Sequence, residues 1–449
     1  MSRGFRRRLA GIAALGFGLR AVVALAVAPA SLTARGDPRY FHQAANLLAD
    51  GHGYIIPAQW FMSGAEVPAT EHPPLWSAVL SPFAALGATS VHSQQLVGCA
   101  VGAATIACAG ALGRRVGGDR VGLLAAAACA LYPVFVAMDG SLMSEPLYAL
   151  CVAVVLLTAL RVAEAPSLRR SALLGLVIGV TALARTEAIA LVVLIGVPLA
   201  LRLRERRATH LAVVTAVALA AVAPWCIRNS VELHRPMLVS SEDGSVLAGA
   251  NCPLTYRGYD MGYWNAHCVR PAHDRNSAFA SVRLRAVGLR YARDHAGRIP
   301  AVEGVRLLRT FGIWQAHRHV YFAEGRDLPW RSVAVGACWA VLALGLAGAA
   351  VLRRTDPWRL GLLLTPVALA VITTLLAFGY PRFRYAADVS LLVLAALVVE
   401  RVWRRYGRRP AKRSEPAAAP SSSTSPPTAN AEVASRRTFF WPRREPRVL

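Results

Sequence analysis

Apolar runs of roughly 20 residues alternate with short polar connections along most of this chain. Because a membrane-spanning helix needs about 20 mostly apolar residues, we expect ten of these runs to cross a bilayer: 9–30, 94–113, 119–137, 142–162, 171–184, 187–201, 209–226, 331–352, 359–378 and 385–403. A further apolar stretch, 75–90, is short and interrupted by Pro82 and Gly87, which favours a surface or re-entrant helix. The pattern predicts an all-α polytopic membrane protein with about ten transmembrane helices.

The basic residues set the expected orientation. Arginines precede the first run at 6–8 and follow later runs at 114–115, 202–207, 353–354 and 404–405. With ten crossings, all of these clusters fall on one side, as the positive-inside rule requires. A crossing at 75–90 would invert everything downstream and break this agreement. We therefore expect both termini in the cytoplasm and two large external segments, 31–93 and 227–330.

Composition supports the membrane class and argues against nucleic acid. The chain has 449 residues, of which 55% are hydrophobic, and its formal net charge is +25. The positive charge lies between apolar runs rather than interleaved with aromatics on a polar domain, so we expect no nucleic-acid partner. The predicted parts are a first transmembrane helix (1–30), an external catalytic loop with juxtamembrane helices (31–93), transmembrane helices (94–226), an external domain (227–330), further transmembrane helices (331–403) and a disordered cytoplasmic tail (404–449).

Charged positions at the predicted external ends of the spans are the main functional signal. A charged side chain next to hydrocarbon is costly and marks a functional hypothesis by default. The positions in question are Asp37, Glu71-His72, Asp139, Glu145, Arg185, Glu187, Arg382 and Arg384. We expect them to lie on one face, where membrane meets water.

Asp37 opens a short amphipathic segment and has two readings. It is a good helix N-cap, with Pro38 suited to the first helical position and Gly51 to the C-terminal cap. Alternatively, its carboxylate faces a substrate at the membrane surface and acts as a general base. Both readings remain open at the level of local sequence.

The same loop carries a family resemblance that covers roughly residues 1–230 well. The pattern is Asp37, Tyr40, Ala44 and Leu47, then Gly51-His-Gly-Tyr54, followed by Glu71-His-Pro-Pro-Leu-Trp76. It resembles the first external loop of GT-C glycosyltransferases, membrane enzymes related to protein mannosyltransferases and lipid A aminoarabinose transferases. Many members carry Asp-Glu where this chain has Asp37-Pro38, which removes one carboxylate from the loop.

The resemblance implies a function, a donor and roles for individual residues. It implies transfer of a sugar from a polyprenyl-phosphate donor to a lipid, glycan or protein acceptor, by inverting displacement with Asp37 as the base. It also places Tyr40 and His72 among the substrate-binding residues. Glu145, in Ser144-Glu-Pro146, matches an acidic position that faces the donor or a metal in the family, although Ser144 and Pro146 also suit a plain helix start.

Arginines near the ends of later spans are the candidate phosphate ligands. Guanidinium groups give bidentate contacts to phosphate, and Arg382-Phe-Arg384-Tyr385 begins the last span. An ordinary interfacial anchor of Arg and Tyr is the alternative. Arg185 with Glu187 forms a second substrate-binding candidate, for which a local salt bridge is the alternative.

A divalent cation is a weak further candidate. Glu71, His72 and Glu145 could surround Mg²⁺, Mn²⁺ or Zn²⁺, but their spacing specifies no metal.

Cys252 and Cys268 lie in the predicted external domain and are expected to form a disulfide. The oxidising environment and a closed loop of about 15 residues favour pairing, worth about 3 kcal/mol; two free thiols or a metal pair with His267 is the alternative.

The competing function is a transporter or flippase of lipid-linked sugars. A transporter would be expected to have internal repeats and interrupted spans with polar groups near mid-bilayer, and the sequence has no evident repeat.

Overall fold

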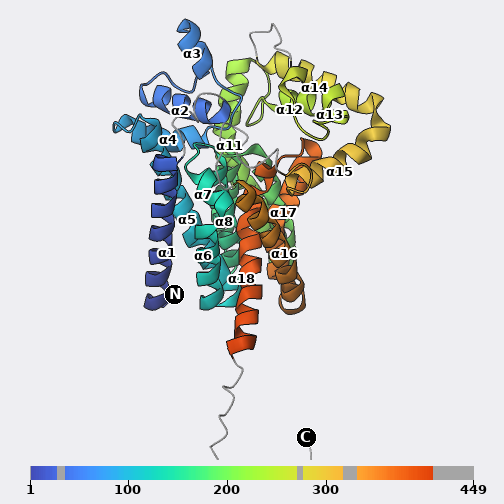
Figure 1. The fold of residues 1–449 in the computed structure, drawn as a ribbon. Helices are drawn as coiled ribbons and strands as arrows, with labels where there is room; N and C mark the ends of the chain where they lie inside the picture. Colours follow the sequence, from blue (N-terminus) through green and yellow to red (C-terminus); the bar gives the residue numbers. More distant parts are fainter. Residues whose placement is uncertain (1, 28–35, 270–276, 317–330, 408–449) are drawn as a thin grey trace, which may run out of the picture. The chain divides into compact units, whose positions relative to one another are not determined.

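Long helices form the body of the protein, with shorter helices gathered at one end (Figure 1). The computed structural model describes residues 2–27, 36–269, 277–316 and 331–407. Within these ranges the secondary structure is helical apart from one isolated bridge between Ile55 and Pro68. The predicted all-α fold is confirmed.

Six helices among the described residues are long and apolar enough to cross a membrane. They are α1 with its π-helical extension (Arg3–Val27), α5 (Val91–Gly117), α8 (Glu145–Glu164), α11 (Arg207–Leu233), α16 (Ser332–Thr355 of Arg331–Thr355) and α17 (Pro357–Leu376). A seventh span results if α6 (Asp119–Leu131) and α7 (Pro133–Asp139) count together. The multi-pass membrane protein is therefore supported, but the ten predicted crossings are not confirmed.

The remaining predicted spans are shorter or broken. Helix α9 (Leu168–Ala182) has 15 residues, and the run at 187–201 divides into a 3₁₀ turn η3 (Thr186–Ala190), a π segment η4 (Val192–Gly196) and α10 (Val197–Arg202). The last run forms α18 (Tyr385–Gly407). Nearly all of the tail predicted from residue 404 lies outside the described residues.

A proline breaks the span formed by α6 and α7. Tyr132 is extended, Pro133 begins α7, and the two axes differ by 60°. The break frees carbonyls at the end of α6. The guanidinium of Arg20 from α1 binds two of them, donating to Ala130 O at 2.9 Å and Cys129 O at 3.0 Å. A buried arginine thus compensates for a helix break inside the bundle.

Small residues let the long helices approach closely. In α5, Gly110 and Gly113 pack against α6. A methyl group added at either position would lie only 3.0–3.3 Å from atoms of α6, and at Gly110 it would also clash with the side chain of Leu9 in α1. Gly175 and Gly179 of α9 meet α11 in the same way. Membrane helices without a hydrophobic driving force between them associate through such small-residue contacts.

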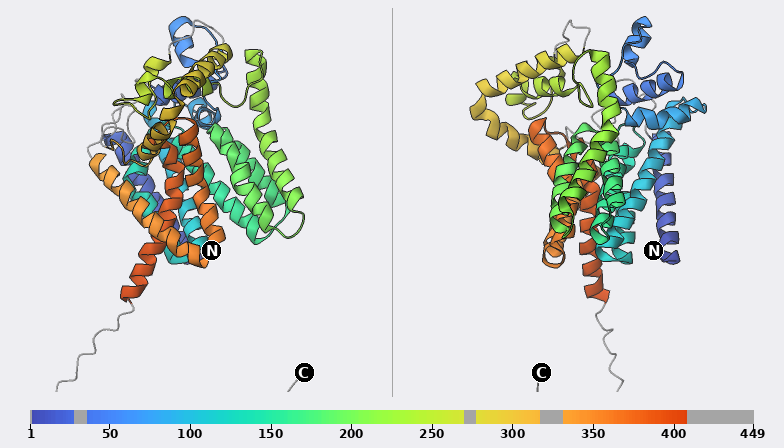
Figure 2. Two further views of the ribbon diagram at one scale, coloured as in Figure 1. Left: turned by 90° about the vertical axis from the view of Figure 1, so that its right-hand side faces the viewer. Right: turned by 180° about the vertical axis from the view of Figure 1, so that it is seen from behind.

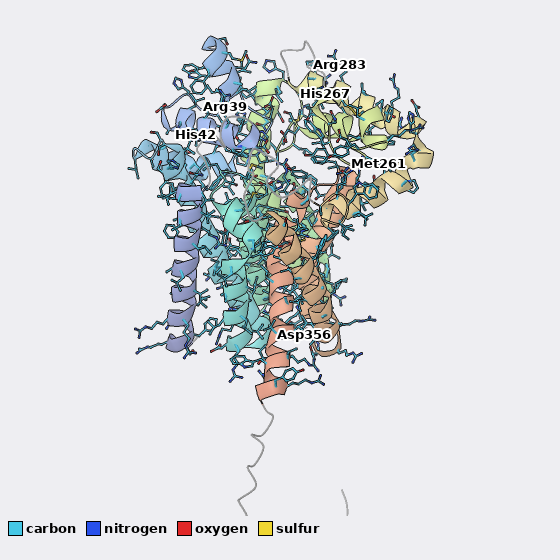
Figure 3. All side chains as sticks on the ribbon, in the orientation of Figure 1. Arg39, His42, Met261, His267, Arg283 and Asp356 are labelled. Atoms are coloured by element: carbon cyan, nitrogen blue, oxygen red, sulfur yellow. A yellow bond between two sulfur atoms is a disulfide. The ribbon has the colours of Figure 1, made fainter. Side chains whose placement is uncertain are left out.

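The shorter helices gather at the end of the bundle opposite the start of α1 (Figures 1 and 2). From the first of the two segments predicted to be external come α2 (Gly36–Ala49), α3 (Pro57–Ser63) and α4 (Leu75–Ala85). From the second come α12 (Asp243–Ala250), α13 (Pro253–Tyr256), α14 (Ser277–Asp294) and α15 (Ile299–Thr310). Figure 3 places the labelled residues Arg39, His267 and Arg283 at this end and Asp356, in the α16–α17 turn, at the other.

A disulfide closes the loop after α12. The Sγ atoms of Cys252 and Cys268 are bonded at 2.10 Å. Within the loop, Gly262 O accepts a hydrogen bond from Gly379 N at 2.8 Å, and the Tyr263 ring lies 5.5 Å from that of Tyr380. The loop therefore packs on the segment that follows α17, next to the site described below.

Candidate functional site

One cavity of about 290 Å³ opens where the short helices meet the bundle. Its size is near the lower end of the range for small-molecule sites, roughly 300–1,000 Å³. The walls come from five parts of the chain that are far apart in sequence: residues 37–73, Ser144 before α8, the turn after α9, the start of α12, and the end of α17 with the α17–α18 connection. The charged lining residues are Asp37, His72, Arg185, Glu187, Glu242, Asp243 and Arg382.

Asp37 contacts Arg382 at the centre of this cavity. Helix α2 is described from Gly36 to Ala49, and Asp37 lies in its first turn. Arg382 Nη1 donates to Asp37 Oδ2 at 2.9 Å, and both side chains are partly buried, with 18% and 27% exposure. Arg382 belongs to a short 3₁₀ helix, η7 (Pro381–Arg384), and its guanidinium faces the carboxylates of Asp37 and Glu145.

Glu145 lies behind the cavity wall and holds both arginines. Its Oε1 accepts from Arg185 Nη1 at 2.7 Å and lies 3.6 Å from Arg382 Nε. The side chain is only 1% exposed, and its Oε2 has no hydrogen-bond partner. Glu145 is the first residue of α8 and Pro146 follows it, as the helix-start reading expects, and its carboxylate also pairs with the two arginines.

The expected local pair between Arg185 and Glu187 is present. Arg185 Nε donates to Glu187 Oε1 at 2.7 Å, while the guanidinium also lies over the rings of Tyr148 and Phe383. Arg185 therefore joins the local turn to α8 and η7. The structure brings Asp37, Glu145, Arg185, Glu187 and Arg382 into a single ion-pair network.

His72 and Glu242 close the opposite wall. His72 Nδ1 lies 3.3 Å from Glu242 Oε1. The backbone alongside is held in place because Ser241 N donates to Thr70 O at 2.9 Å and the hydroxyl of Ser240 donates to Glu71 O. The sequence analysis missed Glu242, and its signal is weak: a Ser-Ser-Glu-Asp run at the start of a helix.

Electrostatics shift the pKa values of the groups outside the spans. Burial alone would raise the pKa of Asp37, but the charges of Arg382 and His72 outweigh it and hold that pKa below its usual value. Burial would lower the pKa of His72, but Glu242, Asp37 and Glu71 raise it. Dehydration in the cavity raises the pKa of Glu242, against the effect of His72. At neutral pH Asp37 is ionised, as a general base must be.

Three residues predicted for this face lie elsewhere. Arg384 is buried and donates to Asp388 Oδ2 at 3.1 Å and to the hydroxyl of Tyr132 at 3.3 Å. Tyr385 is also buried, and its hydroxyl donates to Asp139 Oδ1 at 2.7 Å. Asp139 in turn pairs with Arg20 inside the bundle. Arg384, Tyr385 and Asp139 therefore stabilise the helix packing and do not line the cavity.

Tyr40 and Glu71 lie beside the site. The Tyr40 ring packs against His72 with centroids 4.4 Å apart, and Tyr40 is not among the cavity-lining residues. Glu71 contributes its carbonyl oxygen to the contact with Ser240.

The expected metal ligands do not form a binding group. Among residues 2–27, 36–269, 277–316 and 331–407, no three His, Cys, Asp or Glu side chains lie close enough together to hold an ion. His72 faces Glu242, and the guanidinium of Arg382 lies between Asp37 and Glu145. As arranged here, these residues do not fit a divalent cation.

A comparison with known families matches the part of the chain that carries much of this site. Residues 71–227 match the family described as dolichyl-phosphate-mannose-protein mannosyltransferase. The matched range includes His72, Glu145, Arg185 and Glu187 and ends before Glu242 and Arg382. No curated protein matches the chain.

Two of the solved structures that are similar to this chain come from Archaeoglobus fulgidus and Cupriavidus metallidurans. The oligosaccharyltransferase of Archaeoglobus fulgidus, in a crystal structure tethered with an acceptor peptide, has a TM-score of 0.54 at 15% identity. The similarity covers 90% of this chain and 50% of that one, so the chain spans about half the length of that protein. ArnT from Cupriavidus metallidurans, bound to undecaprenyl phosphate, has a TM-score of 0.39 at 15% identity, with 90% and 79% of the two chains covered. The similarity to the oligosaccharyltransferase confirms the GT-C-like fold expected from the first-loop motif.

Proposed function

We propose that this chain is a membrane glycosyltransferase that moves a sugar from a polyprenyl-phosphate-linked donor to an acceptor outside the cytoplasm. The observation that carries the proposal is the convergence of Asp37 with Arg185 and Arg382 in one cavity of a GT-C fold. A carboxylate and two guanidiniums are the groups that this transfer needs. The matched mannosyltransferase family supports the same reaction class.

The proposed chemistry divides between the carboxylate and the arginines. Asp37 accepts the proton of the acceptor hydroxyl as its oxygen attacks the anomeric carbon. The bond from that carbon to the lipid phosphate breaks, and the departing phosphate gains negative charge that the guanidiniums stabilise. Attack opposite the leaving group inverts the anomeric configuration. Glu145 keeps the two arginines at the cavity wall and acts through them.

The test is transfer of a labelled sugar from polyprenyl-phosphate donors in membranes that contain the protein. We expect Asp37→Asn to lose transfer by roughly a hundredfold or more, the usual contribution of a general base. Asp50→Asn is the matched control, because Asp50 is an exposed carboxylate at the end of the same helix. Transfer by Asp37→Asn at the wild-type rate would refute the base assignment.

The same experiment separates the remaining choices. Failure with every donor, together with movement of lipid-linked sugar across the bilayer, would favour the transporter or flippase. Lipid, glycan and protein acceptors are compared in parallel. An arm with EDTA tests for Mg²⁺, Mn²⁺ or Zn²⁺, and our mechanism routes no step through a metal.

A further inference from the structure

The contact between Asp37 and Arg382 conflicts with the geometry that the proposed reaction needs. In an in-line displacement the base and the leaving phosphate lie on opposite sides of the sugar. Here the proposed base, Asp37, accepts a hydrogen bond at 2.9 Å from Arg382, one of the proposed phosphate ligands. A sugar cannot fit between two atoms that are in hydrogen-bond contact. The ion pair must therefore open before a donor can react.

The charges around the cavity lead to the same conclusion. Three carboxylates, those of Asp37, Glu145 and Glu187, share the two guanidiniums of Arg185 and Arg382. A donor phosphate adds negative charge to a network that already has an excess of it. Like charges brought together in a partly buried site repel strongly, so one carboxylate has to give up its arginine.

Exposure and connectivity identify that carboxylate as Asp37. Its side chain is 27% exposed, compared with 1% for Glu145, so water can solvate it when it leaves. Glu187 is similarly exposed at 24%, but it is held by Arg185 only two residues away in the same turn. Asp37 comes from a separate external helix and pairs across 345 positions of sequence.

We propose that the phosphate of a polyprenyl-phosphate ligand binds by exchange, replacing the Asp37 carboxylate as the partner of Arg382. The inference rests on the proposed function and adds a gate to it. In the resting protein Arg382 holds the base in an ion pair. Phosphate binding to Arg382 displaces the Asp37 carboxylate, frees it for an acceptor hydroxyl and opens the space in which the sugar lies. The base is therefore released only when a donor is present.

The exchange predicts that a variant defective in transfer binds the lipid phosphate more tightly than the wild type does. In Asp37→Asn the neutral amide competes less well for Arg382, so the phosphate has less to displace. We expect the dissociation constant for undecaprenyl phosphate to fall about three- to tenfold, the range expected when a partly exposed ion pair no longer competes. The measurement is titration of the full chain in nanodiscs, with undecaprenol as the ligand that lacks the phosphate.

Two controls assign the effect to the pair itself. Asp243→Asn removes a carboxylate from the same cavity, but Asp243 pairs with Arg285 and not with Arg382; we expect less than about a twofold change, since this exposed pair is worth little. In an Arg382→Gln background, Asp37→Asn should have no further effect on binding, because the pair that it releases is already absent.

The outcomes of the titration are distinct. Unchanged or weaker binding by Asp37→Asn overturns the exchange. An equal gain in affinity for undecaprenyl phosphate in Asp243→Asn also overturns it, because that result would indicate a general charge effect. A gain in affinity that persists when Asp37→Asn is made in the Arg382→Gln background overturns it as well. Absence of phosphate-dependent binding by the wild type also overturns it. If binding follows the prediction but no donor supports transfer, the exchange stands and the proposed glycosyltransferase activity fails.

Discussion

The buried pair of Arg20 and Asp139 provides the sharpest test of what holds the bundle together. Arg20 has no exposed surface and Asp139 has 4%. Replacing Arg20 by Met keeps the side-chain length but leaves the Asp139 carboxylate with the hydroxyl of Tyr385 as its remaining hydrogen-bond donor among the described side chains. The same change removes the donors to Cys129 O and Ala130 O at the α6–α7 break. A buried charge without its counterion and two carbonyls without donors result.

The magnitude follows from that inventory. Removing one partner of a buried ion pair costs about 3–5 kcal/mol, because the other charge remains uncompensated. Arg114→Met is the matched control. Arg114, in the last turn of α5, pairs with Asp119, and the two side chains are 32% and 48% exposed. Exposed pairs contribute about 0–1 kcal/mol. We therefore expect Arg20→Met to lose several times more stability than Arg114→Met.

Unfolding by SDS titration in mixed micelles, followed by tryptophan fluorescence, measures both variants on one scale. A second variant, Arg20→Met with Asp139→Leu, removes both charges. It should recover much of the loss, since an apolar pair avoids the orphaned carboxylate. If Arg20→Met is as stable as Arg114→Met, the reasoning is refuted. If the double variant is no more stable than the single one, the loss does not come from the unpaired charge.

Two further predictions concern the walls of the cavity. The double variant Cys252→Ser, Cys268→Ser should destabilise the segment that contains this loop by about 3 kcal/mol, because the loop is no longer closed. It should also lower transfer, because the closed loop packs on the residues that lead into Arg382. Faster proteolysis of the segment checks the first effect, and wild-type resistance together with wild-type transfer would contradict the prediction. His72 has a raised folded pKa, so its pairing with Glu242 stabilises the protein fully below about pH 6.5 and is lost as the pH rises through the folded value. Melting temperatures between pH 6 and 9 should fall more for the wild type than for His72→Gln, and parallel curves would count against the pair.

The sequence carried enough information for the fold and for most of the cavity. Apolar runs and arginine clusters predict helices in a membrane, and the first-loop motif predicts the GT-C fold. Four charged residues of the cavity were predicted from their positions near the ends of spans: Asp37, His72, Arg185 and Glu187. The number of crossings was less certain, because runs such as 171–184 and 187–201 form a 15-residue helix and a broken segment. Composition identifies apolar runs but not where backbone breaks divide them.

Glu242 was missed for a different reason. It lies 170 positions after His72 and reaches it because Ser240 and Ser241 bond the backbone of residues 70–71. That contact depends on how the two external segments dock, and no local pattern encodes it. A carboxylate in a polar segment has no unusual free-energy cost, so the sequence does not single it out as functional. A carboxylate beside hydrocarbon does have such a cost.

Arg382 and Arg384 differ in role because of helix geometry. Both looked equivalent in sequence, but they lie in a 3₁₀ helix with three residues per turn, so positions two apart point about 120° away from each other. When Arg382 faces the cavity, Arg384 must face the bundle, where it pairs with Asp388 one turn into α18. The next residue, Tyr385, meets Asp139 and through it Arg20. The buried ion pairs thus fix the base of η7, and the arginine proposed to exchange between Asp37 and a phosphate projects from a segment that cannot itself move far. For this reason we place the movement in Asp37 and its external helix rather than in Arg382.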